Sequence, residues 1–177
     1  ASFISTGAIA FLGYAQTLYV LPVSLFGMSV AAAELPELSR ERSRAGDVLR
    51  TRVEGGLTRI AVLVVPSIVG YLALGDVIVA ALYQSGEFGP AETFVTYLIL
   101  AGYTLGLLAS TATRLFSSAF FALHDTRTPA KVAAIRVLVA ASIGAVLMFA
   151  FETVEVRGYT LGALGLSLAA ALAAWLE

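Results

Sequence analysis

The chain has 177 residues, of which 59% are hydrophobic and only 13% are charged, and its formal net charge is −1. Soluble domains are about 45–50% apolar and about 25% charged, so the composition excludes an ordinary soluble domain and indicates a membrane protein. The absence of cysteine excludes disulfides, cysteine-ligated zinc and thiol catalysis, and the net charge gives no basic field for nucleic acid.

Residues 1–33 carry no charge and form a run too long for one span of about 20 residues. We predict a break where Gln16 and Thr17 interrupt the apolar pattern, with a truncated helix before it and a second helix from about Leu18. This second helix contains Pro22. An interior proline leaves a carbonyl unpaired at a cost of about 3 kcal/mol unless a neighbour satisfies it. We therefore expect the helix to be bent and to face protein or a cavity.

Residues 40–59 are the most polar stretch of the sequence. A third helix is predicted from about 48 to 74. Glycine and aspartate at 75–76 predict a break before a short apolar segment over 77–83. A turn is predicted at 85–90.

Gly89 and Pro90 predict the start of the next helix, because proline at the first helical position loses no hydrogen bond. Residues 93–113 are an uncharged run of spanning length. Arg114 then interrupts the run, and the apolar pattern resumes to Leu123. This region predicts one span with a charged residue inside it.

The polar segment 124–129 predicts a tight connection, with Thr128 as the N-cap of a fifth span over about 130–151. Residues 152–160 are expected to form a loop, and 161–176 to begin a sixth span. The sequence therefore predicts an all-α fold. It is a polytopic transmembrane helical bundle of about six membrane-spanning helices, the first and last truncated.

The spans form one predicted transmembrane domain over residues 1–177. Because the chain starts with Ala1 and ends inside an apolar run, we expect it to be an internal piece of a larger protein. Ten of its eleven Lys and Arg residues fall on alternate connections, within 40–59 and 114–136, and the other is Arg157. By the positive-inside rule, the two arginine-rich connections are predicted to be cytoplasmic.

Arg114 lies eleven residues before Asp125, which is about 16 Å along a helix from the polar connection. A guanidinium group at membrane depth is rare unless it faces a cavity or a partner, and it can bind a phosphate through two hydrogen bonds. We predict that Arg114 binds substrate. The alternative is that it snorkels or pairs with a structural carboxylate such as Glu34.

Three further charged residues are candidates for a site. Arg59, at the predicted cytoplasmic start of the third span, either anchors that end of the helix or draws an anionic headgroup inward. Glu34 and Asp76 are carboxylates flanked by apolar residues, which makes them candidate ion or proton sites. Beside Pro36 and Gly75, they could instead satisfy broken helix backbone.

No catalytic residue, cofactor or metal site is predicted. His124 and Asp125 have no visible nucleophile or metal partner, so we expect them to organise the connection. The sequence lacks a phosphate-binding loop with Gly-Lys-Ser/Thr and a zinc helix motif, which argues against an ATPase or a hydrolase. Glycines at 102, 106, 158, 162 and 165 include small-xxx-small spacings that favour close helix packing.

Three motifs carry a family resemblance. They are LPVSLFGM at 21–28 followed by LPELS at 35–39, LYQSGEF at 82–88, and FFALHDTRTP at 120–129. In this order and spacing they resemble the MurJ/MviN lipid II flippase family, over essentially the whole chain. The resemblance implies the fold of multidrug/oligosaccharidyl-lipid/polysaccharide exporters, working by alternating access, with this chain in the second half of about fourteen spans.

The resemblance also implies a cargo and a location. The cargo is undecaprenyl-diphosphate-linked muropeptide, a lipid-linked oligosaccharide. It is moved across the bacterial inner membrane for peptidoglycan synthesis, with membrane lipids and cell-wall synthesis proteins as partners. Many family members have Asp-Arg where this sequence has Gln16 and Thr17, so one expected diphosphate contact is missing. Arg114 stands where members often carry a basic residue.

Three alternatives stay open. An exporter of another lipid-linked glycan, or a cation-coupled antiporter, predicts that Glu34 or Asp76 lines the central cavity. A transport-inactive scaffold for cell-wall synthesis is suggested by the Gln16-Thr17 departure. A membrane glycosyltransferase or acyltransferase would need polar residues clustered at one membrane face.

Overall fold

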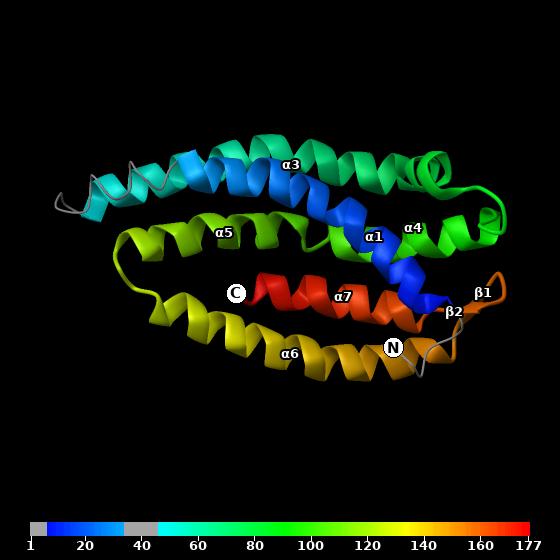
Figure 1. The fold of residues 1–177 in the computed structure, drawn as a ribbon. Helices are drawn as coiled ribbons and strands as arrows, with labels where there is room; N and C mark the ends of the chain where they lie inside the picture. Colours follow the sequence, from blue (N-terminus) through cyan, green and yellow to red (C-terminus); the bar gives the residue numbers. More distant parts are fainter. Residues whose placement is uncertain (1–6, 34–45) are drawn as a thin grey trace.

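The computed structural model describes residues 7–33 and 46–177, and its long helices lie side by side along one direction (Figure 1). Two short strands form an antiparallel hairpin, in which Glu155 pairs with Thr160 and Val156 with Tyr159. The elements are α1 (Ala8–Pro22), the π-helical η1 (Val23–Met28), α3 (Gly46–Tyr83), α4 (Pro90–Thr104), α5 (Leu107–Ala122), α6 (Arg127–Glu152), β1 (Glu155–Val156), β2 (Tyr159–Thr160) and α7 (Gly162–Trp175).

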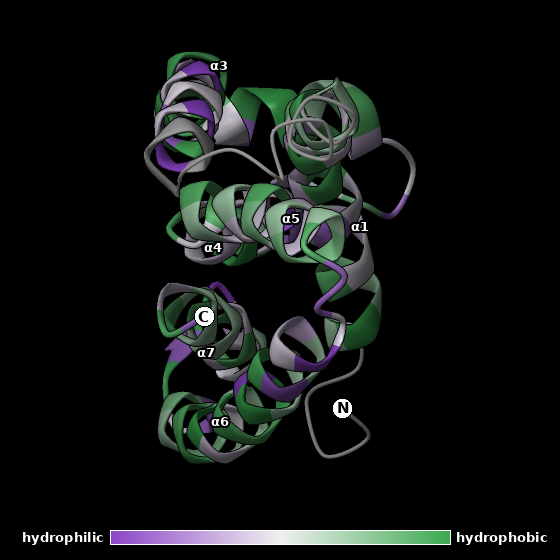
Figure 2. Ribbon diagram, turned by 90° about the vertical axis from the view of Figure 1, so that its left-hand side faces the viewer, coloured by the Kyte–Doolittle hydropathy of each residue, from purple (hydrophilic) through white to green (hydrophobic). Residues whose placement is uncertain are grey.

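The bundle has two ends that we name by their connections (Figure 1). The hairpin end carries β1–β2 and the α3–α4 connection at 84–89, and the turn end carries the α5–α6 turn at 123–126 and the start of α3. Figure 2, a view from the turn end, shows hydrophobic residues over most of the helices and hydrophilic residues at the start of α3 and in the α5–α6 turn. This distribution agrees with helices that cross a membrane and with polar connections at the membrane surface.

Three helices are long and apolar enough to span a membrane: Ala8–Ala33, Arg50–Tyr83 and Arg127–Glu152. The pair α4 and α5, bent by 43°, makes a fourth span if it is counted as one, and α7 is a shorter apolar helix. The predicted all-α transmembrane bundle is therefore confirmed. Within the described residues it has four such spans and α7, fewer than the six expected.

The predicted break at Gln16 and Thr17 is wrong, and it accounts for one of the missing spans. One helix runs from Ala8 to Ala33 through both residues. Thr17 is accommodated because its hydroxyl donates to the carbonyl of Gly13 at 2.9 Å, within the same helix. Gln16 and Thr17 are therefore polar residues within one continuous helix and do not end it.

The carbonyl that Pro22 leaves unpaired is satisfied by a neighbouring helix, in agreement with the expectation that this helix faces protein. The proline cannot donate to the carbonyl of Leu18, four residues earlier. Instead, the hydroxyl of Tyr71 on α3 donates to that oxygen at 2.7 Å. Directly after Pro22 the helix passes into the π-helical turn η1. The proline is thus tolerated inside a span because a second helix supplies the missing donor.

The predicted break at Gly75 and Asp76 is also wrong, because α3 is helical from Gly46 to Tyr83. A Cβ atom at Gly75 would lie 2.8 Å from the ring of Tyr97 on α4, so the glycine allows close packing of the two helices. The Tyr97 hydroxyl donates to a carbonyl of α3 at 2.9 Å. Here glycine marks a helix contact rather than a helix end.

Helix α4 begins at Pro90, as predicted. Glu92 stabilises this start, because its carboxylate accepts the N–H of Gly89 at 2.8 Å in a capping box. The same carboxylate accepts a hydrogen bond from the hydroxyl of Tyr159 in the hairpin. The first turn of α4 is thereby tied to the α6–α7 connection.

Helix α5 ends in a Schellman motif. His124 adopts the left-handed conformation with φ 61°. Its N–H donates to the carbonyl of Phe121 at 2.9 Å, and the N–H of Asp125 donates to that of Phe120 at 3.0 Å. The pair His124 and Asp125 thus has a structural part in the turn, as expected.

The start of α6 differs from the prediction. The helix begins at Arg127, so its N-cap position is Thr126 instead of Thr128, and the Thr126 side chain makes no capping hydrogen bond. The Asp125 carboxylate accepts the N–H groups of Arg127 and Thr128 at 2.9 and 3.0 Å, and also the Thr128 hydroxyl. Thr128 is therefore a donor within the first turn.

Four of the five predicted packing glycines lie at helix contacts. A Cβ atom at Gly106 would lie 2.6 Å from the Cα of Ala171, and one at Gly165 would lie 2.6 Å from the carbonyl oxygen of Leu147. Gly102 and Gly162 are similarly crowded, by Ser167 and Glu152. The prediction is wrong for Gly158, which has φ 86° in the hairpin and open space around it.

Candidate functional site

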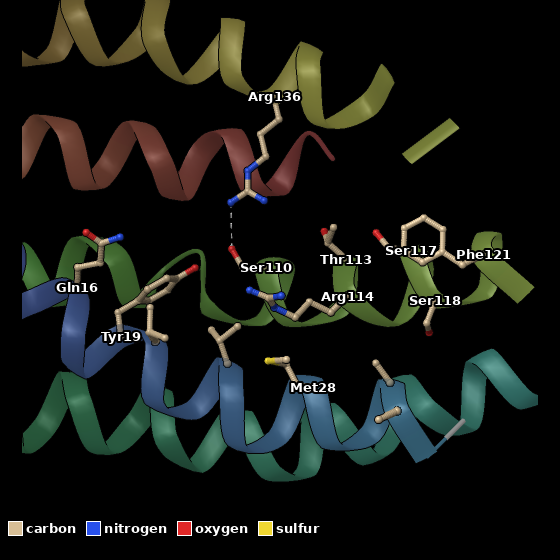
Figure 3. Close-up of a pocket in the computed structure, with 14 residues that line it drawn as sticks. Gln16, Tyr19, Met28, Ser110, Thr113, Arg114, Ser117, Ser118, Phe121 and Arg136 are labelled. Carbon is tan, nitrogen blue, oxygen red and sulfur yellow. Dashed lines mark hydrogen bonds between the residues drawn. The ribbon is translucent and has the colours of Figure 1, made fainter. Parts of the chain in front are cut away.

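An open cavity of about 670 Å³ is lined by the helix 8–33, α5 and α6 (Figure 3). Its wall combines apolar side chains, such as Tyr19 and Met28, with the polar Gln16 and several hydroxyl groups. Two arginines, Arg114 from α5 and Arg136 from α6, also line it. A space with both an apolar wall and positive charge suits an amphiphile with an anionic group.

Helix α5 supplies the polar wall of the cavity. Its lining residues recur every three or four positions, so they share one face of the helix. This face was not predicted, because 93–113 were considered only as an uncharged run of spanning length. Hydroxyl residues at helical spacing on both sides of Arg114 are the signal that could have found it. The face comprises Ser110, Thr113, Arg114, Ser117, Ser118 and Phe121.

Arg114 stands eight residues before the last residue of α5, about 12 Å from that helix end. A Cβ atom on Gly27 would lie 3.6 Å from its Cδ and 2.8 Å from Cγ2 of Thr111. The absence of a side chain at Gly27 therefore lets η1 pack against the stem of Arg114. Among the described residues, no acceptor forms a hydrogen bond or an ion pair with its guanidinium group.

Arg136 enters the cavity from the opposite side. Its guanidinium group forms an ion pair with the carboxylate of Glu177 and donates to the Ser110 hydroxyl at 3.4 Å (Figure 3). The Glu177 side chain is only 9% exposed, against 31% for Arg136. From the sequence, Arg136 was considered only as one of the positive charges that indicate the orientation of the bundle in the membrane. Its contact with Glu177 was therefore not predicted.

A second hollow of about 280 Å³ lies between α5 and α6 towards the turn end. It shares Thr113 and Ser117 with the main cavity, and Glu177 also borders it. The rest of its wall is largely apolar, with Phe116 and Val132 among its residues. The main cavity thus continues into an apolar space beside α6.

The other predicted site residues lie elsewhere. Arg59 is on the exposed surface of α3, which contributes no residue to the main cavity. Asp76 lines a separate hollow of about 440 Å³ near the hairpin end. There Arg157 lies 4.4 Å above the ring of Phe94. Glu34 lies outside the described residues. The roles predicted for these three residues stay predictions.

The chemistry of the main cavity is that of binding. Among the described residues, its lining contains no His, Cys, Asp, Glu or Lys side chain that could act as a general base. Across the residues that the structure describes, no three His, Cys, Asp or Glu side chains gather where they could hold a metal ion. Two guanidinium groups and a row of hydroxyls are suited to phosphate oxygens.

Comparisons with known proteins point to one family. The family described as "Lipid II flippase MurJ" matches residues 1–177. A protein of Rhizobium meliloti named "Probable lipid II flippase MurJ" is 37% identical over 146 residues, which cover 80% of this chain and 26% of that protein. One of the same name from Rickettsia prowazekii is 28% identical over 175 residues, covering 98% of this chain and 32% of its own length.

A solved structure gives the same result. It is described as "Lipid II flippase MurJ, inward closed conformation", and it superposes with a TM-score of 0.80 at 28% sequence identity. The match covers 99% of this chain and 35% of the solved chain. The chain therefore spans about a quarter to a third of the length of the relatives that it matches.

Proposed function

The chain belongs to the lipid II flippase MurJ family, and we propose that it works as part of the C-terminal half of a larger flippase-like transporter. That transporter moves undecaprenyl-diphosphate-linked muropeptide across the bacterial cytoplasmic membrane by alternating access. Residues 1–177 contribute one transmembrane domain to it. Interaction with cell-wall synthesis proteins belongs to the same proposal.

The observation that carries this proposal is the position of Arg114. It lines the cavity at membrane depth and has no partner among the described residues. A cationic group at membrane depth is costly unless it faces a cavity or a partner. A diphosphate provides such a partner, since guanidinium and phosphate form parallel, charge-assisted hydrogen bonds. The apolar wall formed by Tyr19, Val23 and Met28 accommodates the adjoining hydrocarbon.

The test is complementation in a bacterium depleted of its own lipid II flippase. The full-length parent gene should restore growth, Arg114→Ala should lead to lysis, and Arg114→Lys should rescue partially, because lysine keeps the charge but loses the fork geometry. Arg50→Ala is the matched control. Arg50 also lies on a helix, but it pairs with Glu54 at 2.8 Å on the exposed face of α3.

Failure of the membrane-inserted wild-type protein to restore growth would count against the proposal. The departure at Gln16 and Thr17 would then favour a different lipid-linked glycan or a transport-inactive scaffold. Gln16 lines the cavity, so a change there alters the cargo path itself. For the cation-coupled alternative, Asp76 lies in a different hollow, and Glu34 lies outside the described residues, so its role there stays a prediction.

We propose a separate role for Arg59 in drawing the anionic headgroup towards the cavity. Since this residue lies outside the cavity lining, Arg59→Ala should slow transport without changing the affinity of the purified protein for undecaprenyl diphosphate. A loss of affinity equal to that of Arg114→Ala would contradict this division of roles.

A further inference from the structure

We infer that Arg136 is a second anion-binding residue of the cavity, and that Glu177 occupies it as an internal competitor until a diphosphate displaces the carboxylate. The inference rests on the proposed function and assigns roles to two residues within the same site. It predicts that substituting Arg136 weakens cargo binding, whereas substituting Glu177 strengthens it.

The first step is the convergence of two guanidinium groups. Ser110 and Arg114 are four residues apart on α5, so they lie one above the other on the same face. Arg136 reaches across from α6 and donates to the Ser110 hydroxyl at 3.4 Å (Figure 3). Arg114 and Arg136, from two different helices, thus line one cationic region of the cavity, and Ser110 lies within it.

The second step is the partner that Arg136 already has. The Glu177 carboxylate pairs with Arg136 through one oxygen, Oε2. A phosphate oxygen can accept the same charge-assisted hydrogen bond from a guanidinium group. Arg114 has no comparable partner among the described residues. In the cavity, the charge of Arg136 is therefore neutralised by Glu177, while the guanidinium group of Arg114 can bind a ligand.

The third step is the exchange. A diphosphate carries more negative charge than one carboxylate, and it can contact Arg114 and Arg136 together, whereas Glu177 pairs with Arg136 alone. Glu177 also borders the second hollow, where the hydroxyls of Thr113 and Ser117 are available to it. The carboxylate can thus leave Arg136 and still have polar neighbours.

The experiment measures equilibrium binding of undecaprenyl diphosphate to the full-length protein in nanodiscs, with undecaprenyl monophosphate as the comparison ligand. We expect Arg136→Ala to weaken diphosphate binding about tenfold, because a charge-assisted hydrogen bond is lost. Arg136→Lys should fall between this variant and wild type. Glu177→Gln should strengthen binding about threefold or more, because the competing charge is removed.

Two controls separate binding from folding. Arg50→Ala and Glu54→Gln break an exposed ion pair on α3, outside the cavity, and should leave binding unchanged. Thermal unfolding is recorded for every variant, and Arg136→Gln replaces Arg136→Ala if the alanine variant is unfolded. The preference for diphosphate over monophosphate should drop in Arg136 variants, a change that a merely structural ion pair does not produce.

The outcomes are distinguishable. If Arg136 and Glu177 variants shift binding in the same direction, or neither shifts it, the pair is structural and the inference is wrong, while Arg114→Ala still reports on the proposed function. If wild-type protein binds undecaprenyl diphosphate no better than Arg114→Ala does, the proposed function fails, and the inference fails with it.

Discussion

Single hydrogen bonds keep irregular backbone stable inside this bundle, and the carbonyl opposite Pro22 is the clearest case. Tyr71→Phe removes the donor to the Leu18 oxygen and leaves a part-buried carbonyl unsatisfied. We expect a loss of about 1–3 kcal/mol in the free energy of unfolding. Thermal unfolding in detergent measures it.

The matched control is Tyr97→Phe. Its hydroxyl also donates to a carbonyl of α3, that of Leu72, but this oxygen lies in regular helix and keeps its backbone partner. The expected loss is therefore smaller. Equal losses in the two variants would show that the proline gap is not what makes Tyr71 important.

The stability that the turn between α5 and α6 contributes should depend on pH, because the carboxylate of Asp125 accepts hydrogen bonds from the first turn of α6. Hydrogen bonds from the hydroxyl and the backbone N–H of Thr128 hold the pKa of Asp125 below its ordinary value. The pKa of Asp125 is thus lower in the folded protein than in the unfolded chain, where it is about 3.9. The stabilisation from the ionised carboxylate is therefore complete above that pH, and it is lost as the pH falls through the pKa of the folded protein. The difference in Tm between wild type and Asp125→Ala should shrink below about pH 4. A difference that persists unchanged in acid would contradict this role.

At the residue scale, sequence reasoning identified Arg114 and missed Arg136. Arg114 is conspicuous because it interrupts an apolar run. Arg136 lies near the start of a span, where an arginine that anchors the helix and one that faces a cavity have the same sequence signature. The difference depends on Ser110 and Glu177, which are 26 and 41 residues away in the chain.

Helix packing depends on glycines that face a neighbouring backbone. Gly106→Ala would place a Cβ atom 2.6 Å from the Cα of Ala171, and backbone cannot move aside as a flexible side chain can. We expect this variant to lose about 1–3 kcal/mol of stability, the usual cost of overpacking. Thermal unfolding of the full-length protein measures the loss.

Gly70→Ala is the matched control for this prediction. Gly70 lies inside α3, and a Cβ atom there meets nothing within 4 Å. Because alanine favours the helix by up to about 1 kcal/mol over glycine, Gly70→Ala should be neutral or stabilising. If Gly106→Ala is equally well tolerated, the contact between the α4–α5 bend and α7 is looser than the structure shows.

At the element scale, the sequence located helix ends better than helix breaks. Gly89 and Pro90 mark a true start, because proline at the first position and the Glu92 carboxylate act locally. The breaks predicted near Gln16 and at Gly75 depend on what lies beside the helix. In a membrane bundle, polar residues can face a cavity, and glycines can face another helix, without ending the span.

The orientation of the whole bundle can be tested with single cysteines, since the chain has none of its own. Ser85→Cys lies at the hairpin end and Thr126→Cys at the turn end, and both positions are exposed. In intact cells expressing a parent without other cysteines, a membrane-impermeant maleimide should label Ser85→Cys. It should label Thr126→Cys only after permeabilisation. The reverse pattern would overturn the assignment from the arginine distribution.

For the whole molecule, composition was sufficient to predict a helical membrane protein, and the three motifs were sufficient to predict the family. The number of spans was overestimated, because the one long helix over 8–33 was read as two. Hydropathy measures how apolar a segment is. It does not show whether a polar position inside the segment is accommodated by a neighbouring helix, which is decided by tertiary contacts.

The 43° bend between α4 and α5 also has a mechanical consequence. On one side of the bend, α4 is held by close glycine contacts with α3 and α7. On the other side, α5 carries the polar face of the cavity. The indole of Trp175 donates to the carbonyl of Leu105 at the bend itself, at 2.8 Å. Helix α5 is about 24 Å long, so a rotation of about 10° at this point displaces its far end by about 4 Å. A small torsional change beside Leu105 is thus amplified along the helix into a change in the width of the cavity.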